Sequence, residues 1–231
     1  ECLFQSGKQK RALLSIPNFP LPISKPPQIR HRISPSAHGN GMFATRNLAP
    51  NDLILAERPL LVISRAMQLG IPDAQITQLT PAQTMKAQLE EYEELLRFCI
   101  DRMSPENGTA FFKLHNCHTE DSSGPILGIL RTNAIGFSVA GSDVKKEDKE
   151  FFSNVGIFAV ASRMNHSCTP NVSPHFHSPS FSLRLHATRS ITAGEELFIS
   201  YTDNCKPRAE RQEDLRPYGF KCACGACSDP D

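Results

Sequence analysis

The feature that most constrains this chain is a tight group of cysteines in its last ten residues. Cys222, Cys224 and Cys227 form the pattern C-x-C-x-x-C and account for three of the eight cysteines in the sequence. Disulfide frameworks rarely concentrate thiols in this way, and no secretory signal is recognisable, so we expect thiolate ligands in a reducing compartment. Three thiolates can surround a zinc ion at about 2.3 Å, but a closed structural zinc site needs a fourth ligand. That ligand must come from elsewhere in the chain.

Spacing alone leaves the identity of the fourth ligand open. Cys205 is near the group in sequence. Cys2, Cys99 and Cys117 lie in segments where a cysteine is usually a small buried hydrophobe or a surface thiol. Cys168 is a further candidate, and it belongs to the run R-M-N-H-S-C-T-P-N of residues 163–171.

The same run raises the alternative of a thiol enzyme, with Cys168 as the nucleophile and His166 as the base. Such an enzyme needs the two side chains within hydrogen-bond reach, and we expect residues two apart to be poor partners in either a strand or a helix. The local sequences typical of papain-like and caspase-like nucleophiles are also missing. The sequence therefore predicts that these residues do not form a protease dyad.

The pattern of apolar and turn-forming residues predicts a β-rich domain with a helical insert. Prolines are frequent in residues 16–36, and we expect a proline-rich arm over residues 1–28, of which the first nine are excluded from the fold prediction because they resemble a protease recognition sequence. Short β-type runs in residues 29–64 indicate a small antiparallel sheet, and further strands are expected in residues 155–201.

The clearest helix signal begins at Thr80. A threonine N-cap, a proline at the first helical position and a glutamine three residues after the cap precede apolar residues at helical spacing. This pattern predicts a helix from about residue 81 to residue 103, and shorter helical or mixed segments are expected in residues 109–137. A last helix is expected over residues 208–216, between two prolines.

Charge and hydropathy exclude two classes of partner. The 25 basic residues are balanced by 24 acidic ones, which gives a net charge of +1 and no polycationic surface for direct nucleic-acid binding. The sequence also lacks a run near the ~18 apolar residues that a membrane span requires. We therefore expect no nucleic acid and no membrane among the partners, and we predict a monomer in the cytoplasm, the nucleus or both.

Four motifs in a fixed order resemble SET-domain protein lysine methyltransferases, most closely the SMYD class. They are HGNGMFA (residues 38–44), RMNHSCTPN (163–171), GEELFISY (194–201) and YGFKCACGAC (218–227). The resemblance covers residues 29–227. It implies an α+β fold, mostly β with a helical insert: a SET-domain β-clip with a threaded C-terminal segment and a zinc-binding post-SET tail. The implied boundaries are 29–203 for the SET domain, with the insert at about 65–150, and 204–231 for the tail.

The resemblance also implies an activity and a cofactor. The chain is expected to transfer methyl groups from S-adenosylmethionine to the side-chain amine of lysine in a protein or peptide substrate. Tyr201 is the expected catalytic residue, because a tyrosine hydroxyl at this motif position can align the amine. Residues expected to contact the cofactor are His38, Gly39, Asn40, Gly41, Asn133, Ser162, Asn165, His166, Tyr201 and Phe220.

Further roles follow from the same resemblance. Tyr218 and Ile199 are expected to line the lysine channel, and Cys168 becomes the fourth ligand of one structural zinc ion held with Cys222, Cys224 and Cys227. The MYND zinc module of SMYD proteins is expected to be missing, because residues 65–115 contain one cysteine and one histidine, Cys99 and His115. The alternative function is a catalytically inactive SET-like zinc module that binds a peptide or a protein as an adaptor.

Overall fold

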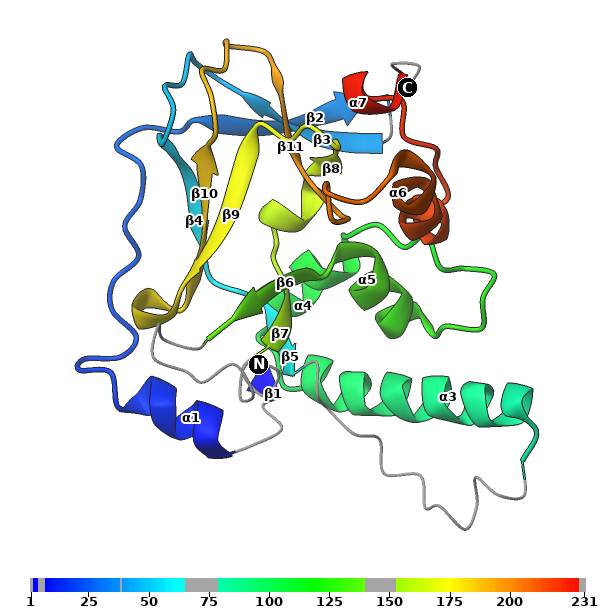
Figure 1. Cartoon of the computed structure of the whole chain (residues 1–231). Helices are drawn as coiled ribbons and strands as arrows, with labels where there is room; N and C mark the ends of the chain where they lie inside the picture. The colour runs from blue at the N-terminus through cyan, green and yellow to red at the C-terminus, as the bar shows by residue number, and fades with distance from the viewer. Residues whose placement is uncertain (1, 4–6, 38, 65–78, 140–152, 229–231) are drawn as a thin grey trace. The chain divides into compact units, whose positions relative to one another are not determined.

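The strands within the described residues form three small sheets (Figure 1). The computed structural model describes residues 2–3, 7–37, 39–64, 79–139 and 153–228. The chain divides into a first unit, residues 1–17 and 59–159, and a second unit, residues 18–58 and 160–231. His38, one of the expected cofactor residues, lies outside the described residues.

A sheet with the strand order β1-β5-β7-β6 forms part of the first unit. Its strands are β1 (Cys2–Leu3), β5 (Leu61–Ser64), β6 (Ile135–Ser138) and β7 (Ser153–Ile157). β1 is parallel to β5, whereas β7 pairs with β5 and β6 in antiparallel fashion. β5 is buried along its whole length, which explains why its sequence is a continuous apolar run with no alternation.

The helices of the first unit include the one that the sequence predicted most clearly. They are α1 (Gly7–Leu14), α3 (Pro81–Ile100), α4 (Pro105–Phe112) and α5 (Pro125–Asn133). The α3 prediction is confirmed: Thr80 accepts a hydrogen bond from the main-chain N–H of Gln83, and the Gln83 side chain accepts one from the N–H of Thr80. Strand β1 and helix α1 lie in the N-terminal residues, of which the first nine were left out of the fold prediction.

A buried carboxylate joins two of these helices. Glu93, on α3, accepts hydrogen bonds from the main-chain N–H groups of Ile126 and Leu127 in the first turn of α5. The N-cap of α5 is Gly124, which has no side chain to satisfy these donors. A negative charge at the N-terminus of a helix also interacts favourably with the helix dipole. Glu93 lies in an acidic stretch of α3, and its role there is structural.

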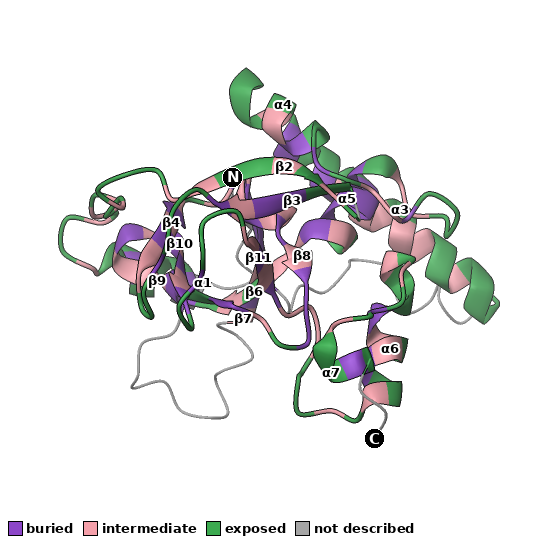
Figure 2. Ribbon diagram, turned by 90° about the horizontal axis from the view of Figure 1, so that it is seen from above, coloured by how far each residue is buried: buried purple, intermediate pink, exposed green. Residues whose placement is uncertain are grey.

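Two sheets form the framework of the second unit. One has the order β2-β3-β11-β8 and the other the order β4-β10-β9. The first contains β2 (His31–Ser36), β3 (Gly39–Ala44), β11 (Glu196–Ile199) and β8 (Asn165–His166). The second contains β4 (Leu53–Glu57), β10 (Ser182–Ala187) and β9 (Val172–His177). Along β10, Leu183 and Leu185 are buried while Arg184 and His186 are partly exposed, as expected for a sheet with one buried face. Figure 2 shows burial in the other sheet, where much of β3 is buried and β2 is exposed or partly exposed.

The predicted antiparallel sheet of residues 29–64 needs a correction. Only β2 and β3 pair with each other, in antiparallel fashion from His31–Ala44 to Ser36–Gly39. β4 pairs with β10, and β5 belongs to the sheet of the first unit. Strand propensity identifies such segments, but it does not determine which distant strand each one joins. The predicted α+β class is confirmed.

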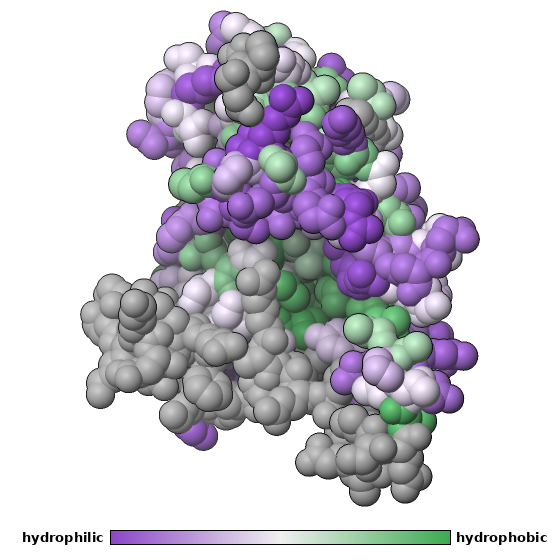
Figure 3. Space-filling model, turned by 45° about the vertical axis from the view of Figure 1, so that its right-hand side comes forward, coloured by the Kyte–Doolittle hydropathy of each residue, from purple (hydrophilic) through white to green (hydrophobic). Residues whose placement is uncertain are grey.

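The C-terminal part of the second unit is helical. It contains α6 (Arg208–Leu215), η5 (Arg216–Tyr218) and α7 (Gly225–Ser228), drawn in orange to red in Figure 1. α6 begins after Pro207, as the sequence predicted. The upper surface in Figure 3 is mostly hydrophilic, in agreement with the charged composition of α6. No helix among the described residues is long and apolar enough to cross a membrane.

Candidate functional site

Four cysteine sulfur atoms lie together in the second unit. They belong to Cys168, Cys222, Cys224 and Cys227, and all lie within 4.8 Å of one another. The Sγ atoms of Cys168 and Cys227 are 3.6 Å apart, far longer than the ~2.05 Å of a disulfide bond. Four thiolates placed tetrahedrally at ~2.3 Å from a zinc ion would be about 3.8 Å apart. The donor set and its spacing therefore fit a structural zinc ion.

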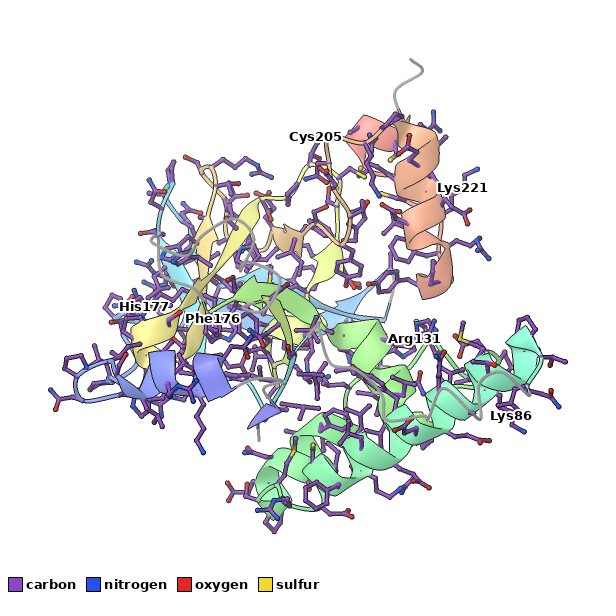
Figure 4. All side chains as sticks on the ribbon, turned by 60° about the horizontal axis from the view of Figure 1, so that its bottom comes forward. Lys86, Arg131, Phe176, His177, Cys205 and Lys221 are labelled. Atoms are coloured by element: carbon purple, nitrogen blue, oxygen red, sulfur yellow. The ribbon has the colours of Figure 1, made fainter. Side chains whose placement is uncertain are left out.

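The structure also separates this group from the other candidate cysteines. Cys205 is exposed on the loop between β11 and α6 (Figure 4). In the first unit, Cys99 is buried in the apolar core and the Cys117 sulfur lies 3.3 Å from the Thr132 hydroxyl. Among the described cysteines, Cys168 is the one that joins the tail group, as the family resemblance implied.

Electrostatics oppose four ionised thiols in the absence of a cation. Burial raises the pKa of the Cys168 thiol, and the neighbouring thiols raise it further, although a hydrogen bond from Arg211 acts in the opposite direction. Burial also raises the pKa of the Cys222 thiol. For Cys224, burial acts to raise the pKa, but hydrogen bonds with Cys168, Cys222 and Cys227 outweigh it and lower the pKa to about 7. A divalent cation would offset the charge that these buried thiolates carry together.

The His166 side chain contacts this group, which corrects one expectation from the sequence. The His166 Nε2 atom lies 3.3 Å from the Cys168 Sγ atom, although residues two apart were expected to be poor partners. β8 ends at His166, and the backbone beyond it lets the two side chains meet. Nδ1 accepts a hydrogen bond of 3.0 Å from the main-chain N–H of Tyr201, so in the neutral ring Nε2 carries the proton.

The charge state of His166 argues against a thiol nucleophile. Burial, followed by the charge of Arg211, lowers the pKa of His166 to about 4. The ring is therefore neutral near pH 7 and donates its Nε2 proton toward the Cys168 sulfur. Because Nδ1 is already occupied, the imidazole lacks an acceptor nitrogen with which to activate Cys168. The prediction that the pair is not a protease dyad agrees with this arrangement, although its geometric reason was wrong.

Three aromatic side chains pack beside the thiol group. Tyr201, Tyr218 and Phe220 contact the buried cluster formed by the cysteines and Leu215. The ring centroids of Tyr201 and Tyr218 are 4.9 Å apart, and those of Tyr218 and Phe220 are 6.4 Å apart. The His166 ring completes the group at 5.4 Å from Tyr201 and 6.1 Å from Phe220. Residues from two of the sequence motifs and the tail thus form one contiguous aromatic group.

The hydroxyl of Tyr201 has a defined orientation. It donates a hydrogen bond of 2.5 Å to the main-chain oxygen of Met164, which precedes β8. β8 and β11 pair in parallel, with Phe198 opposite Asn165 and Ile199 opposite His166. This pairing aligns the strand that leads to Tyr201 with the segment that follows Met164. The other expected channel residue, Ile199, is buried, and its main-chain oxygen accepts a hydrogen bond from Ser167.

The two glycines of the first motif differ in what favours a glycine at each position. Gly39 has φ +92°, a conformation that favours glycine, and a Cβ atom built there would meet no atom within 4 Å. At Gly41, a Cβ atom would lie 2.2 Å from the Glu196 carboxylate and 3.0 Å from the Asn165 amide nitrogen. Among the described residues, the space beside Gly39 is open for another group, whereas a side chain at Gly41 would force the Glu196 carboxylate to move. Asn40, between them, is exposed in β3.

The Asn165 side chain holds this strand arrangement together. Its amide nitrogen donates to the Ser36 hydroxyl at 2.9 Å and to the Glu196 carboxylate at 2.8 Å. Both amide hydrogens of Asn165 are therefore used within the protein. The ring nitrogens of His166 also have partners within the protein. Contacts of Asn165 and His166 with a cofactor stay a prediction.

Sequence reasoning missed the role of Asn171, the last residue of the second motif. Asn171 is buried, and its side chain makes hydrogen bonds with the main chain of Glu196 and Phe198 and with the Glu195 carboxylate. It thereby fixes β11 from the turn after Cys168. An asparagine that follows a proline in a turn-forming run was a usable signal for such a main-chain contact.

Sequence analysis predicted the helix over residues 208–216 but assigned no role to Arg211 or Gln212. The guanidinium of Arg211 donates to the sulfurs of Cys168 and Cys227, and the Gln212 amide pairs with the main chain of Cys222. The usable signal was Leu215, the apolar residue four positions after Arg211. Residues four apart share one face of a helix, so Leu215 indicated that Arg211 faces inward.

Two further expected cofactor residues lie in helical segments. Ser162 lies in η3 (Ala161–Arg163), where the main-chain N–H groups of Val160 and Ala161 donate to the Glu57 carboxylate. Asn133, the last residue of α5, belongs to the first unit. Its amide nitrogen donates to the main-chain oxygens of His115 and Ile129, at 2.6 and 2.8 Å. A contact from the Asn133 side chain to a cofactor stays a prediction.

Comparison with known proteins identifies the family. Residues 39–202 match the family model of the SET domain, which spans most of the chain and includes β3, β8, β11 and Tyr201 at its end. The chain belongs to the SET-domain family. This SET-domain chain is similar to proteins named as lysine methyltransferases in a yeast, a bird and an amphibian.

Three relatives illustrate the range of similarity. The chain is 37% identical over 150 residues to the histone-lysine N-methyltransferase set5 of Schizosaccharomyces pombe, covering 64% of this chain and 41% of the relative. It is 40% identical over 99 residues to the protein-lysine N-trimethyltransferase SMYD5 of Gallus gallus, covering 38% and 24%. It is 31% identical over 160 residues to the N-lysine methyltransferase SMYD2-A of Xenopus laevis, covering 66% and 35%. The chain thus spans less than half the length of each of these relatives.

Proposed function

We propose that this SET-domain chain is a protein lysine N-methyltransferase that uses S-adenosylmethionine and carries one structural zinc ion. Membership of the family and similarity to proteins named as lysine methyltransferases support the reaction class. The observation that carries the proposal is the placement of the Tyr201 hydroxyl, 2.5 Å from the Met164 oxygen and within an aromatic group that adjoins the thiol group.

The bound cofactor would supply an electrophilic methyl group on a sulfonium sulfur. The protein's task is then chiefly alignment of a neutral amine, because an in-line attack needs correct geometry more than strong acid or base catalysis. A free lysine has a pKa near ~10.4, so the site must favour its neutral form by desolvation. Tyr201, Tyr218 and Phe220 provide an apolar lining suited to that, and the oriented Tyr201 oxygen can accept a hydrogen bond from the amine.

Cofactor binding is proposed at the first and second motifs. The open space beside Gly39 and the left-handed backbone there suit a close approach by the cofactor's amino-acid part. The remaining proposed contacts come from Asn40, Gly41, Ser162, Asn165 and His166, with Phe220 stacking on the adenine. His38 and Asn133 are retained as proposed contacts without structural support.

The zinc ion is proposed at Cys168, Cys222, Cys224 and Cys227. Their sulfur separations fit tetrahedral thiolate ligation, and no oxygen or nitrogen ligand is needed to complete the set. In this position the ion would join the tail that bears Tyr218 and Phe220 to the segment after β8. Its function would be structural, because four protein ligands leave no open coordination position.

The substrate class is proposed from the same chemistry. A protein or peptide that presents a lysine side chain fits a site that aligns an amine, and buried Ile199 is the residue proposed to limit or permit successive methylations. The relatives are named both as histone and as more general protein lysine methyltransferases, so both substrate types are retained. Three expectations stay predictions: that the chain is a monomer, that it is located in the cytoplasm or nucleus, and that it does not bind nucleic acid directly.

Calorimetric titration of the purified chain with S-adenosylmethionine tests the proposal against the alternative of an inactive adaptor. We expect binding, and transfer of labelled methyl groups to lysine-containing peptides on an array. An adaptor that uses zinc only for structure would bind a peptide but neither bind the cofactor nor label any peptide. That result would replace the enzymatic proposal with the adaptor.

A further inference from the structure

Arg211 is a buried cation in direct contact with the thiol group. It lies on α6 and is 8% exposed. Its Nε atom is 3.3 Å from the Cys168 sulfur, and its Nη2 atom is 3.7 Å from the Cys227 sulfur. The remaining contacts are with main-chain oxygens: Nη1 donates to Lys206 at 2.6 Å and Nη2 to Ala226 at 3.1 Å.

This environment indicates what balances the charge of Arg211. Burial of a guanidinium is unfavourable unless its hydrogens are bonded and its charge is compensated. Among the described residues of this segment, Lys206 pairs with Asp214 and Arg216 with Glu213, while Arg211 pairs with no carboxylate. Its acceptors are two carbonyl oxygens and two sulfurs. Negative charge on the sulfurs is therefore the compensation that the site offers.

A zinc ion with four thiolates keeps an excess of negative charge. Four thiolates and one divalent cation carry a formal charge of about −2, which in a buried site is itself unfavourable. Hydrogen bonds from N–H groups to coordinating atoms lower this charge and orient the ligands. The fork of a guanidinium can reach two sulfurs at once, which an ammonium group cannot do with the same geometry.

We propose that Arg211 is a positioning residue for the zinc site, which retains the metal through N–H···S hydrogen bonds to Cys168 and Cys227. This inference rests on the proposed zinc site. Arg211 contacts one ligand from the segment after β8 and one from the tail, so it holds together the two parts of the chain that the metal would join. Without these bonds the sulfur atoms of Cys168 and Cys227 are held less firmly and the negative charge of the site is less well balanced, so the ion is released faster.

The adjacent residue provides a control for a purely structural effect. The Gln212 amide donates to the Cys222 main-chain oxygen at 2.9 Å and accepts from its N–H at 3.1 Å. Gln212→Ala should loosen the tail without removing either hydrogen bond from Arg211 to sulfur. Arg216, exposed and paired with Glu213 just after α6, provides a control for loss of an arginine from the same region.

The test measures zinc transfer from the full chain to a coloured chelator. Arg211→Met removes the charge at similar length, and Arg211→Lys keeps the charge without the planar fork. We expect zinc release about 10-fold or more faster in Arg211→Met, an intermediate rate in Arg211→Lys, and the wild-type rate in Arg216→Met. Circular dichroism establishes that each compared variant is folded, and Arg211→Lys is the decisive variant if Arg211→Met does not fold.

A spectroscopic readout separates bonding to sulfur from loosening of the tail. In the cobalt-substituted chain, the sulfur-to-metal charge-transfer bands should shift in both Arg211 variants, because their energy depends on hydrogen bonding to the thiolates. They should stay in place in Gln212→Ala. Wild-type zinc release and unshifted bands in folded Arg211→Lys or Arg211→Met would overturn the inference. A wild-type chain without bound zinc would instead refute the proposed zinc site.

Discussion

The hydroxyl of Tyr201 donates a 2.5 Å hydrogen bond to the main-chain oxygen of Met164, while the main-chain N–H of the same tyrosine donates to His166. The backbone of Tyr201 is thus held independently of its hydroxyl. Its ring is also packed against Tyr218. Removal of the hydroxyl alone should therefore change the chemistry of the site and leave its position in the fold intact.

Tyr201→Phe is expected to lower the rate of methyl transfer by about 10²-fold or more, because the amine loses an aligning group. The affinity for S-adenosylmethionine should stay near that of the wild type. Single-turnover assays with labelled cofactor give the rate, and calorimetry gives the affinity. A wild-type rate would remove Tyr201 from the mechanism.

Asn165→Ala is expected to weaken cofactor binding and the fold together. The substitution breaks the hydrogen bonds to Ser36 and Glu196 and should lower the free energy of unfolding by about 1–3 kcal/mol. Urea unfolding and calorimetric titration are the measurements. Ser36→Ala serves as a control, since it removes one of these partners and leaves Asn165 in place. A folded Asn165→Ala variant with wild-type affinity would contradict the proposed cofactor contact.

Cys168→Ser is expected to reduce the zinc content of the purified chain and to expose the tail to proteolysis. Cys205→Ser is the matched control, because Cys205 is exposed and does not belong to the thiol group. Elemental analysis of both variants should show the full metal content in Cys205→Ser. The reverse result, with zinc retained in Cys168→Ser and lost in Cys205→Ser, would show that the ligand set is wrong.

Asn171→Ala is expected to destabilise the chain by about 2–4 kcal/mol, because it leaves buried main-chain groups of β11 without partners. Asn204→Ala, at an exposed asparagine bonded to Ser200, should change the free energy of unfolding by less than about 0.5 kcal/mol. Denaturant unfolding of the two variants gives the comparison. Equal effects would show that the Asn171 contacts do not hold β11.

Acid should weaken the second unit through Glu195. A hydrogen bond from Arg189 opposes the effect of burial and, with bonds from Thr192 and Asn171, lowers the pKa of Glu195 below its ordinary value. Because the folded pKa is lower than the unfolded one, this contribution is present above the unfolded pKa and is lost as the pH falls through the folded pKa.

Glu195→Gln should therefore be less stable than the wild type at pH 7, by an amount below about 1 kcal/mol for a partly exposed ion pair. The difference should shrink as the pH falls below about 4.3, the ordinary value for glutamate. Urea unfolding across this range provides the check, with Glu213→Gln as an exposed control. A stability difference that does not depend on pH would show that it does not come from ionisation of Glu195.

Local signals allowed segments of both units to be predicted. The motifs located the segments that form β3, β8 and β11, and Thr80, Pro81 and Gln83 located the start of α3. These predictions depend on capping, strand propensity and turn chemistry, which act between residues close in sequence. The grouping of β2, β3, β4 and β5 was wrong, because strand partners are determined by distant pairings such as β4 with β10.

The thiol group also combines residues that local signals predict with residues that come from distant segments. Three of its members were recognised from their spacing, but residues alone left the fourth open, and only the family resemblance pointed to Cys168. The contact between His166 and Cys168 was missed because it depends on how the backbone leaves β8. Arg211 was missed because its partners, Cys168 and Cys227, lie 43 and 16 residues away along the chain.

The helix α6 has a consequence for how the sequence of this chain can change during evolution. Its side chains reach the thiol group because Arg211 and Leu215 lie four positions apart, and successive residues of an α-helix are rotated by about 100°. Substitutions on the exposed side of α6 do not change the direction in which Arg211 and Leu215 point. A single inserted or deleted residue between Arg211 and Leu215 would turn one of them away from the cysteines. Related sequences should therefore vary in composition along this helix but conserve the number of residues in that interval.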